Sequence, residues 1–286
     1  MSEHAYTLLR PAQLTSCVVF SSPHSGRDYS PAFRLNSVLQ AQALRSSEDA
    51  FVDELFSAAP DLGAPLLGAT APRAYLDLNR APDELDPALI EGVARIPHNP
   101  RVSSGLGVVP RVVANGRAIY RGKLSLAEAE ARIARHWSPY HAMLRMLIDA
   151  SHQKFGEAVL IDCHSMPHEA IEAHVRPGMT RPDVVLGDRF GAAAGRDVVD
   201  RIEAAFTGAG LRVARNAPFA GAYITQAYGR PSIGQHAVQV EIDRSLYMDE
   251  AQIERRPDFP AFQALMTGVI SGIIGSATRR LPVAAE

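Results

Sequence analysis

The chain has 286 residues, of which 47% are hydrophobic and 21% charged, and 29 basic against 31 acidic side chains give it a formal net charge of −2. This composition supports a large buried core and argues against a disordered chain or a strongly basic nucleic-acid-binding protein. The two cysteines are too few for a disulfide framework, the N-terminus lacks the apolar segment of a signal peptide, and we find no apolar run of the roughly 18–20 residues that cross a bilayer. We therefore expect a cytoplasmic protein with no membrane or nucleic-acid partner.

Short apolar runs bounded by turn residues alternate with amphipathic segments along the chain. Buried strands are predicted at 16–23, 64–68, 73–77, 158–162, 183–187, 212–215 and 237–242. Helices are predicted from 46 or 47 to about 59, from 125 to about 155, and over roughly 195–208 and 258–275. Because strands and helices alternate, we expect an α/β fold with helices on both faces of the sheet, in one domain spanning 1–286.

Three segments carry more specific signals. Ser125 and Glu128 have the spacing of a capping box, and Gly156 ends the long helical pattern that follows them. Pro139 lies inside that pattern, which predicts a kink or two abutting helices. Residues 81–122 show no sustained periodicity, and loops of this length within a domain usually carry function.

Polar side chains follow several of the predicted strands. His24 follows the first strand, Asn79 and Arg80 the third, and His164 the fourth, while Glu241 lies at the end of the last. Ligands of open α/β sheets bind beyond the carboxyl ends of the strands. We therefore expect these side chains to converge on one rim of the sheet.

Two histidines and one carboxylate are typical ligands of a catalytic zinc ion, which keeps one position for water. His164 follows Asp162 by two residues, so both side chains face the same way on a strand and the carboxylate can orient the imidazole. The plainer interpretation is a buried Asp–His hydrogen bond. Glu48 or Asp49 can supply the carboxylate, although acidic residues are also favoured at helix N-termini by the helix dipole.

Other residues suit an acidic substrate and a proton transfer. Glu241 in an apolar strand is either a general base or the partner of an arginine. Arg80, helped by Asn79, can bind a carboxylate through two hydrogen bonds. The Gly-rich segment 219–230, with Tyr223 and Thr225, is either a ligand-binding loop or a packed turn.

The chain resembles the N-formylglutamate amidohydrolase family, a group of zinc carboxypeptidase-like hydrolases. The blocks that carry the resemblance are SSPHSG (21–26), SEDAFVDELF (47–56), LGAP (62–65), RAYLDLNRAPDE (73–84), HWSPYHAML (136–144), LIDCHSMP (160–167), PFAGAYITQAYGRP (218–231) and HAVQVEIDRSLYMDE (236–250). The resemblance implies a three-layer α/β sandwich with a central mixed, mostly parallel sheet. It also implies one zinc ion as cofactor.

The resemblance assigns the metal ligands residue by residue. His24 and His164 match the two histidine ligands. Arg27 stands where related zinc hydrolases carry the glutamate of a His-x-x-Glu pair. The third ligand is therefore expected to be Asp49, with Glu48 as the alternative.

The resemblance also implies a reaction. Glu241 is the expected base, Asn79 and Arg80 bind a substrate carboxylate, and Tyr223 and Thr225 are expected beside them. The expected activity is hydrolysis of a small carboxylate-bearing amide, N-formyl-L-glutamate, to L-glutamate and formate, as in histidine breakdown. The alternatives are a deacylase for another short N-acyl amino acid, such as an acetyl or succinyl derivative, and a non-catalytic carboxylate-binding protein.

Overall fold

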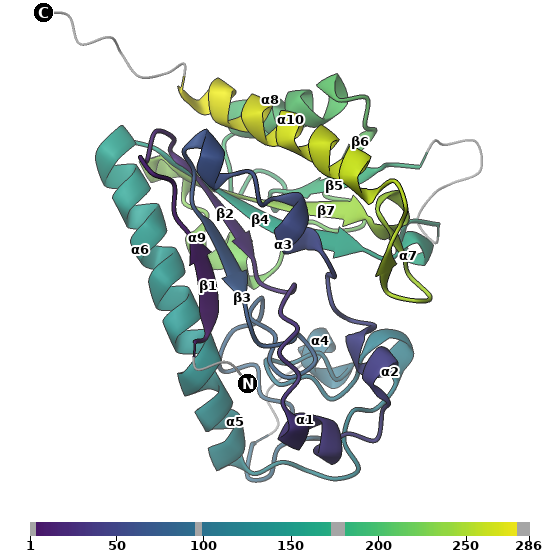
Figure 1. Ribbon diagram of the computed structural model, residues 1–286. Helices are drawn as coiled ribbons and strands as arrows, with labels where there is room; N and C mark the ends of the chain where they lie inside the picture. Colours follow the sequence, from purple (N-terminus) through teal and green to yellow (C-terminus); the bar gives the residue numbers. More distant parts are fainter. Residues whose placement is uncertain (1–3, 95–98, 173–180, 279–286) are drawn as a thin grey trace, which may run out of the picture.

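The computed structural model describes residues 4–94, 99–172 and 181–278, and a seven-stranded sheet forms its centre (Figure 1). The strand order is β1-β3-β2-β4-β7-β5-β6. The strands are β1 Tyr6–Leu9, β2 Val18–Ser22, β3 Leu66–Ala69, β4 Ala158–Met166, β5 Val184–Gly187, β6 Val213–Arg215 and β7 Gln235–Asp243. The central strands β3, β2, β4 and β7 run parallel, whereas β1 and β5 run antiparallel to their inner neighbours. The sheet is thus mixed with a parallel centre, as expected.

Helices cover both faces of this sheet and complete a three-layer α/β sandwich (Figure 1). One layer holds α3 Val52–Leu55, α8 Arg196–Gly208 and α10 Phe259–Thr278, and the other holds α5 Leu126–Arg132, α6 Ser138–Phe155 and α9 Tyr223–Tyr228. A separate apolar core lies under each layer. The remaining elements are α1 Pro31–Asn36, α2 Ala41–Arg45, α4 Pro100–Ser103, α7 His168–Glu172, a two-stranded ribbon of β8 Met248–Asp249 and β9 Glu254–Arg255, and short helical turns η1 Pro60–Leu62, η2 Ala114–Gly116, η4 Pro231–Ile233 and η5 Arg244–Leu246.

Six of the seven predicted strands are present, but the strand predicted at 73–77 is wrong. This segment forms a tight turn in which the carbonyl of Pro72 accepts the N–H groups of Tyr75 and Leu76. Ala74 and Leu76 are buried, whereas Arg73 and Tyr75 are partly exposed. Alternating burial is also typical of a half-buried strand, so the sequence pattern predicted a strand here. The sheet edge is occupied instead by β1, which the sequence patterns did not indicate.

The helix predicted from 46 or 47 to 59 is also wrong in its first half. Helix α2 ends at Arg45 and α3 begins only at Val52, because Phe51 adopts a left-handed conformation with φ of 65° that no α-helix contains. Glu48 and Asp49 therefore lie in a connection between two short helices rather than in the first turn of one.

The long helical pattern after 125 forms a continuous rod with an internal irregularity. The Ser125 hydroxyl accepts the backbone N–H of Glu128 at 3.1 Å, and Gly156 ends the rod with φ of 72°. Between α5 and α6 lies a π-helical turn, η3 Ile133–Trp137, directly before Pro139. Of the kink or two abutting helices predicted around Pro139, the structure shows two helices joined end to end by this wider turn.

Helix α10 corrects the expectation that no segment is long and apolar enough to cross a membrane. Within the described residues it is the one helix that meets this criterion by length and composition, with a mean hydropathy of 1.3 over Phe259–Ala277. Core helices can meet the same criterion. Here α10 packs against α8 and α3 and buries Met266, Val269 and Ile270 in the core.

Gly26 sets the path of the chain after β2. A Cβ atom at this position would lie 2.1 Å from the carbonyl oxygen of Ala71, so a side chain requires one backbone segment to move. We expect Gly26→Ala to lower the free energy of unfolding by about 1–3 kcal/mol. Gly268→Ala is the control, because no atom lies within 4 Å of its added Cβ in α10, and it should raise stability by up to about 1 kcal/mol. Urea unfolding compares the two, and a Gly26→Ala protein as stable as the wild type would contradict this close approach.

Candidate active site

Two imidazoles and one carboxylate meet at the carboxyl ends of β2 and β4. His24 follows β2, His164 belongs to β4, and Asp49 approaches from the connection between α2 and α3. Asp49 Oδ2 lies 3.0 Å from His164 Nδ1 and 3.3 Å from His24 Nδ1, and all three side chains are buried. Each offers one ligand atom within 4.8 Å of the others. Three such donors suit a divalent ion that keeps a free coordination position.

The second nitrogen of each imidazole is bound to a further aspartate. His24 Nε2 lies 2.8 Å from Asp77 Oδ1, and His164 Nε2 lies 2.9 Å from Asp162 Oδ2. A carboxylate at Nε2 keeps the proton there and leaves the Nδ1 lone pair facing the shared point. The sequence indicated this arrangement for Asp162. It missed Asp77, whose only signal is its position two residues before Asn79.

The surrounding charges favour a cation at this point. Burial alone would lower the pKa of His164, but the carboxylates of Asp162 and Asp49 hold it well above its usual value. Burial would likewise raise the pKa of Asp49, whereas hydrogen bonds from His164 and His24 hold it well below its usual value. A metal ion can take the place of the proton that this negative environment attracts. The donor set and its charge therefore fit a zinc ion.

Asp49, rather than Glu48, reaches the histidines. Arg244 Nη2 donates to Asp49 Oδ1 at 2.9 Å, which leaves Oδ2 directed at the imidazoles. Glu48 points elsewhere and accepts hydrogen bonds from Arg45 and from the hydroxyl of Tyr29. The geometry thus separates the two carboxylates that the sequence left as alternatives.

Asn79 and Arg80 have different surroundings. The Asn79 amide nitrogen lies 3.3 Å from Asp162 Oδ2 and 3.1 Å from His164 Nε2, and its oxygen accepts the N–H of Ile224 at 2.7 Å. Because the Nε2 proton of His164 faces Asp162, Asn79 supports the imidazole by donating to the Asp162 carboxylate. The Arg80 guanidinium donates only to the carbonyls of Leu106 and Asn79 among the described residues, although it is only 6% exposed. Burial lowers its pKa, and the charges of nearby arginines contribute.

The α5–α6 rod holds the loop that carries these residues. Three donors on the rod reach backbone carbonyls of this loop: Arg132 to Tyr75 at 3.2 Å, Trp137 to Arg80 at 3.0 Å and His141 to Leu78 at 2.9 Å. Burial lowers the pKa of His141 to about 4. Its ring is therefore neutral at pH 7, with a proton on Nε2 for the Leu78 carbonyl.

Glu241 lies in β7, in register with His164 of β4. Gln239 donates to Glu241 Oε1 at 2.8 Å, and the Gln239 oxygen accepts the N–H of Ala222. Among the described residues, no arginine or lysine forms an ion pair with Glu241. Burial raises its pKa to about 7, against the lowering effect of His164. A carboxylate in this state can exchange a proton near neutral pH.

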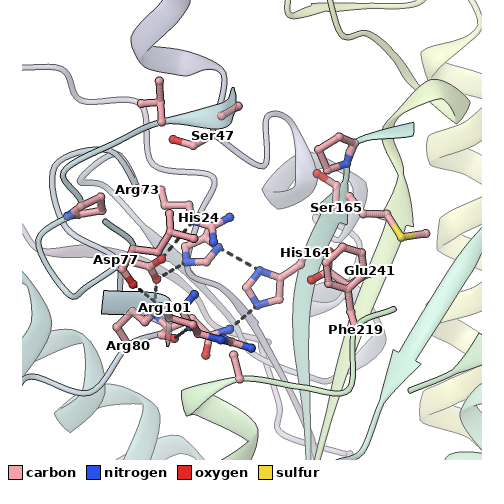
Figure 2. A pocket seen from close by; sticks show the side chains of 18 of the residues that line it. His24, Ser47, Arg73, Asp77, Arg80, Arg101, His164, Ser165, Phe219 and Glu241 are labelled. Atoms are coloured by element: carbon pink, nitrogen blue, oxygen red, sulfur yellow. Dashed lines mark hydrogen bonds and ion pairs between the residues drawn. The ribbon is translucent and has the colours of Figure 1, made fainter. Parts of the chain in front are cut away.

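A cleft of about 600 Å³ opens above these groups (Figure 2). Figure 2 shows Arg73, Asp77, Arg80 and Arg101 on the His24 side and Glu241 on the His164 side. Four guanidiniums line the cleft, those of Arg73, Arg80, Arg101 and Arg244. Its positive lining suits an anionic ligand.

Tyr223 and Thr225 do not line this cleft. The Thr225 hydroxyl is buried and donates to the carbonyl of Ala222 at 2.9 Å, within the first turn of α9. The Tyr223 ring packs against Trp137 and His141. The predicted segment 219–230 instead contributes residues 219–222 to the cleft wall. The two side chains predicted to bind substrate therefore lie behind the wall.

Comparisons with known proteins identify the family of this chain. The family model described as N-formylglutamate amidohydrolase matches residues 16–248. An N-formylglutamate deformylase from Pseudomonas aeruginosa is 33% identical over 237 residues, 82% of either chain. Another from Pseudomonas putida is 32% identical over 238 residues, 82% of this chain and 83% of its own.

Solved structures show the same fold. The crystal structure of an N-formylglutamate amidohydrolase from Ralstonia eutropha superposes with a TM-score of 0.89 at 36% identity, over 96% of this chain and 98% of that one. The gene product Atu2144 from Agrobacterium tumefaciens gives a TM-score of 0.66 at 20% identity, over 96% and 94% of the two chains. The second similarity concerns the fold alone.

We expect Asp77→Asn to weaken zinc binding, because the amide no longer holds the Nε2 proton of His24 as a carboxylate does. Loss of such a supporting carboxylate weakens metal affinity by about 10- to 100-fold. Competition with a chromophoric chelator measures the affinity. Asp86→Asn is the matched control, since Asp86 is equally buried but pairs with Arg111, away from the histidines. Equal affinities for both variants would refute the role of Asp77.

Proposed function

We propose that this chain, which belongs to the N-formylglutamate amidohydrolase family, is a zinc-dependent enzyme that hydrolyses N-formyl-L-glutamate to L-glutamate and formate. The observation that carries the proposal is the buried group of His24, Asp49 and His164 beneath a cleft in which Glu241 and Arg80 form no ion pair with any described residue. The named relatives act on the same compound.

His24 and His164 would hold the zinc ion through Nδ1, and Asp49 through Oδ2. When bound, zinc supplies Lewis acidity, which polarises a carbonyl and makes water more acidic. Asp77 and Asp162 keep the imidazoles in the tautomer that binds metal. Arg244 holds the other oxygen of Asp49 and so favours a single Asp49 oxygen as ligand.

Glu241 is the proposed base. Its carboxylate takes a proton from the attacking water and delivers it to the nitrogen of the departing amino acid. Because Gln239 occupies Oε1, the proton moves through Oε2. Burial raises the pKa of Glu241, which makes it a stronger base than a surface carboxylate.

Arg80 is the proposed partner of a substrate carboxylate. It is buried, faces the cleft and lacks a carboxylate of its own in the described part of the chain. A planar guanidinium binds a carboxylate through two parallel hydrogen bonds. A cytoplasmic location and a role in histidine breakdown also belong to the proposal, and the two free, buried cysteines agree with a reducing compartment.

The proposal predicts formate release from N-formyl-L-glutamate by the zinc-loaded protein. Chelation should abolish the release and added zinc should restore it, which a coupled formate dehydrogenase assay records. Parallel assays with N-acetyl- and N-succinyl-L-glutamate test the larger acyl groups. If formate is not released while the protein binds one zinc ion per chain, the substrate is wrong.

Replacing Glu241 with Gln removes the proton acceptor and keeps the shape of the side chain. We expect kcat to fall by about 10²- to 10⁴-fold, while one zinc ion per chain stays bound. Glu169→Gln is the control, because Glu169 is an exposed carboxylate of α7 outside the cleft. Retained turnover by Glu241→Gln would exclude Glu241 as the base.

A further inference from the structure

Not all of the guanidiniums that line the cleft are neutralised. Two of the four form ion pairs with site aspartates, Arg73 with Asp77 at 3.2 Å and Arg244 with Asp49 at 2.9 Å. Arg80 and Arg101 have no carboxylate within 4 Å among the residues that the structure describes. Within these residues, two positive charges of the cleft therefore form no ion pair, whereas one would suffice for a monocarboxylate.

The backbone ties together the two residues that carry these charges. Arg80 Nε donates to the carbonyl of Leu106 at 2.9 Å, and the N–H of Leu106 donates to the carbonyl of Arg101 at 2.8 Å. One residue thus ties the Arg80 side chain to the end of helix α4, which carries Arg101. Gly105, with φ of 83°, makes the sharp turn between Arg101 and Leu106.

The two positions differ in depth. Arg80 follows Asn79, which contacts His164 at the base of the cleft, and is buried. Arg101 is exposed on α4 and lines the same cleft. In an N-acylated dicarboxylic amino acid, one carboxylate adjoins the carbon that bears the amide and the other lies farther along the side chain. The buried charge therefore suits the first carboxylate and the exposed charge the second.

We propose that Arg101 binds the side-chain carboxylate of the substrate and makes the enzyme selective for N-formyl derivatives of acidic amino acids. This inference rests on the proposed function and adds its determinant of specificity. Arg80 binds the α-carboxylate. A substrate with a neutral side chain leaves Arg101 hydrated and loses one charge-assisted contact without disturbing the reacting groups.

The test compares two substrates that differ only in the terminal charge, N-formyl-L-glutamate and its isostere N-formyl-L-glutamine. Arg101→Gln should lower kcat/KM for the glutamate derivative by about 10- to 100-fold, mostly through KM. For the glutamine derivative it should change kcat/KM by less than about threefold, because no hydrogen bond to a charged group is lost. Arg101→Lys should keep part of the preference, since it retains the charge and loses the planar fork.

Arg121→Gln is the matched control, because Arg121 is exposed in the same irregular segment and does not line the cleft. It should leave both substrates unaffected. An unchanged preference in Arg101→Gln would overturn the inference. So would an equal loss on both substrates, which would assign Arg101 a role in holding Leu106 and Arg80.

Direct binding separates this inference from the proposed function. Calorimetry with the zinc-loaded protein measures glutarate, which has two carboxylates, against butyrate, which has one. Arg101→Gln should weaken glutarate and leave butyrate unchanged, even if no formyl amide is cleaved and the proposed function fails. Unchanged glutarate affinity would overturn the role of Arg101 whatever the activity.

Discussion

Three aspartates are buried around two imidazoles, and a buried carboxylate costs several kcal/mol of folding free energy unless it is paired. Each aspartate therefore has a second partner besides an imidazole: Arg244 for Asp49, Arg73 for Asp77 and Asn79 for Asp162. These partners reach the site from β7's end and from the loop after β3. Because each aspartate bridges an imidazole and a second side chain, the cleft wall and the metal-binding group form one connected network.

The parallel centre of the sheet brings the reacting groups to one edge. Strands β2, β4 and β7 all end at this edge, so His24, His164 and Glu241 emerge together although 217 residues separate the first from the last. The β4–β7 register sets His164 beside Glu241. A slip of β7 by one residue would turn Glu241 to the opposite face and away from His164. The relation between the proposed base and the proposed ligand thus depends on strand pairing rather than on a loop.

Much of this arrangement could be predicted from the sequence, and the failures have physical causes. Three positions were predictable because a polar residue stands at or near the end of an apolar run, namely His24, His164 and Glu241. The strand predicted at 73–77 failed because burial alternates in a turn as it does in a strand. Asp49 could not be separated from Glu48 by pattern, since the bend at Phe51 decides which side chain faces the histidines. Arg101 carried no signal at all, because its segment lacks periodicity and its role depends on distant contacts.

The π-helical turn between α5 and α6 has an evolutionary consequence. An α-helix rotates about 100° per residue, so residues five apart point about 140° away from each other. Arg132 and Trp137 are five apart and yet both reach the loop at 75–80, because a π turn brings residues at this spacing into line. Deleting one residue here would restore regular geometry and rotate one donor off its carbonyl. The rod should therefore tolerate substitutions at its exposed positions. Insertions and deletions should be selected against, so homologues should keep the length of the rod.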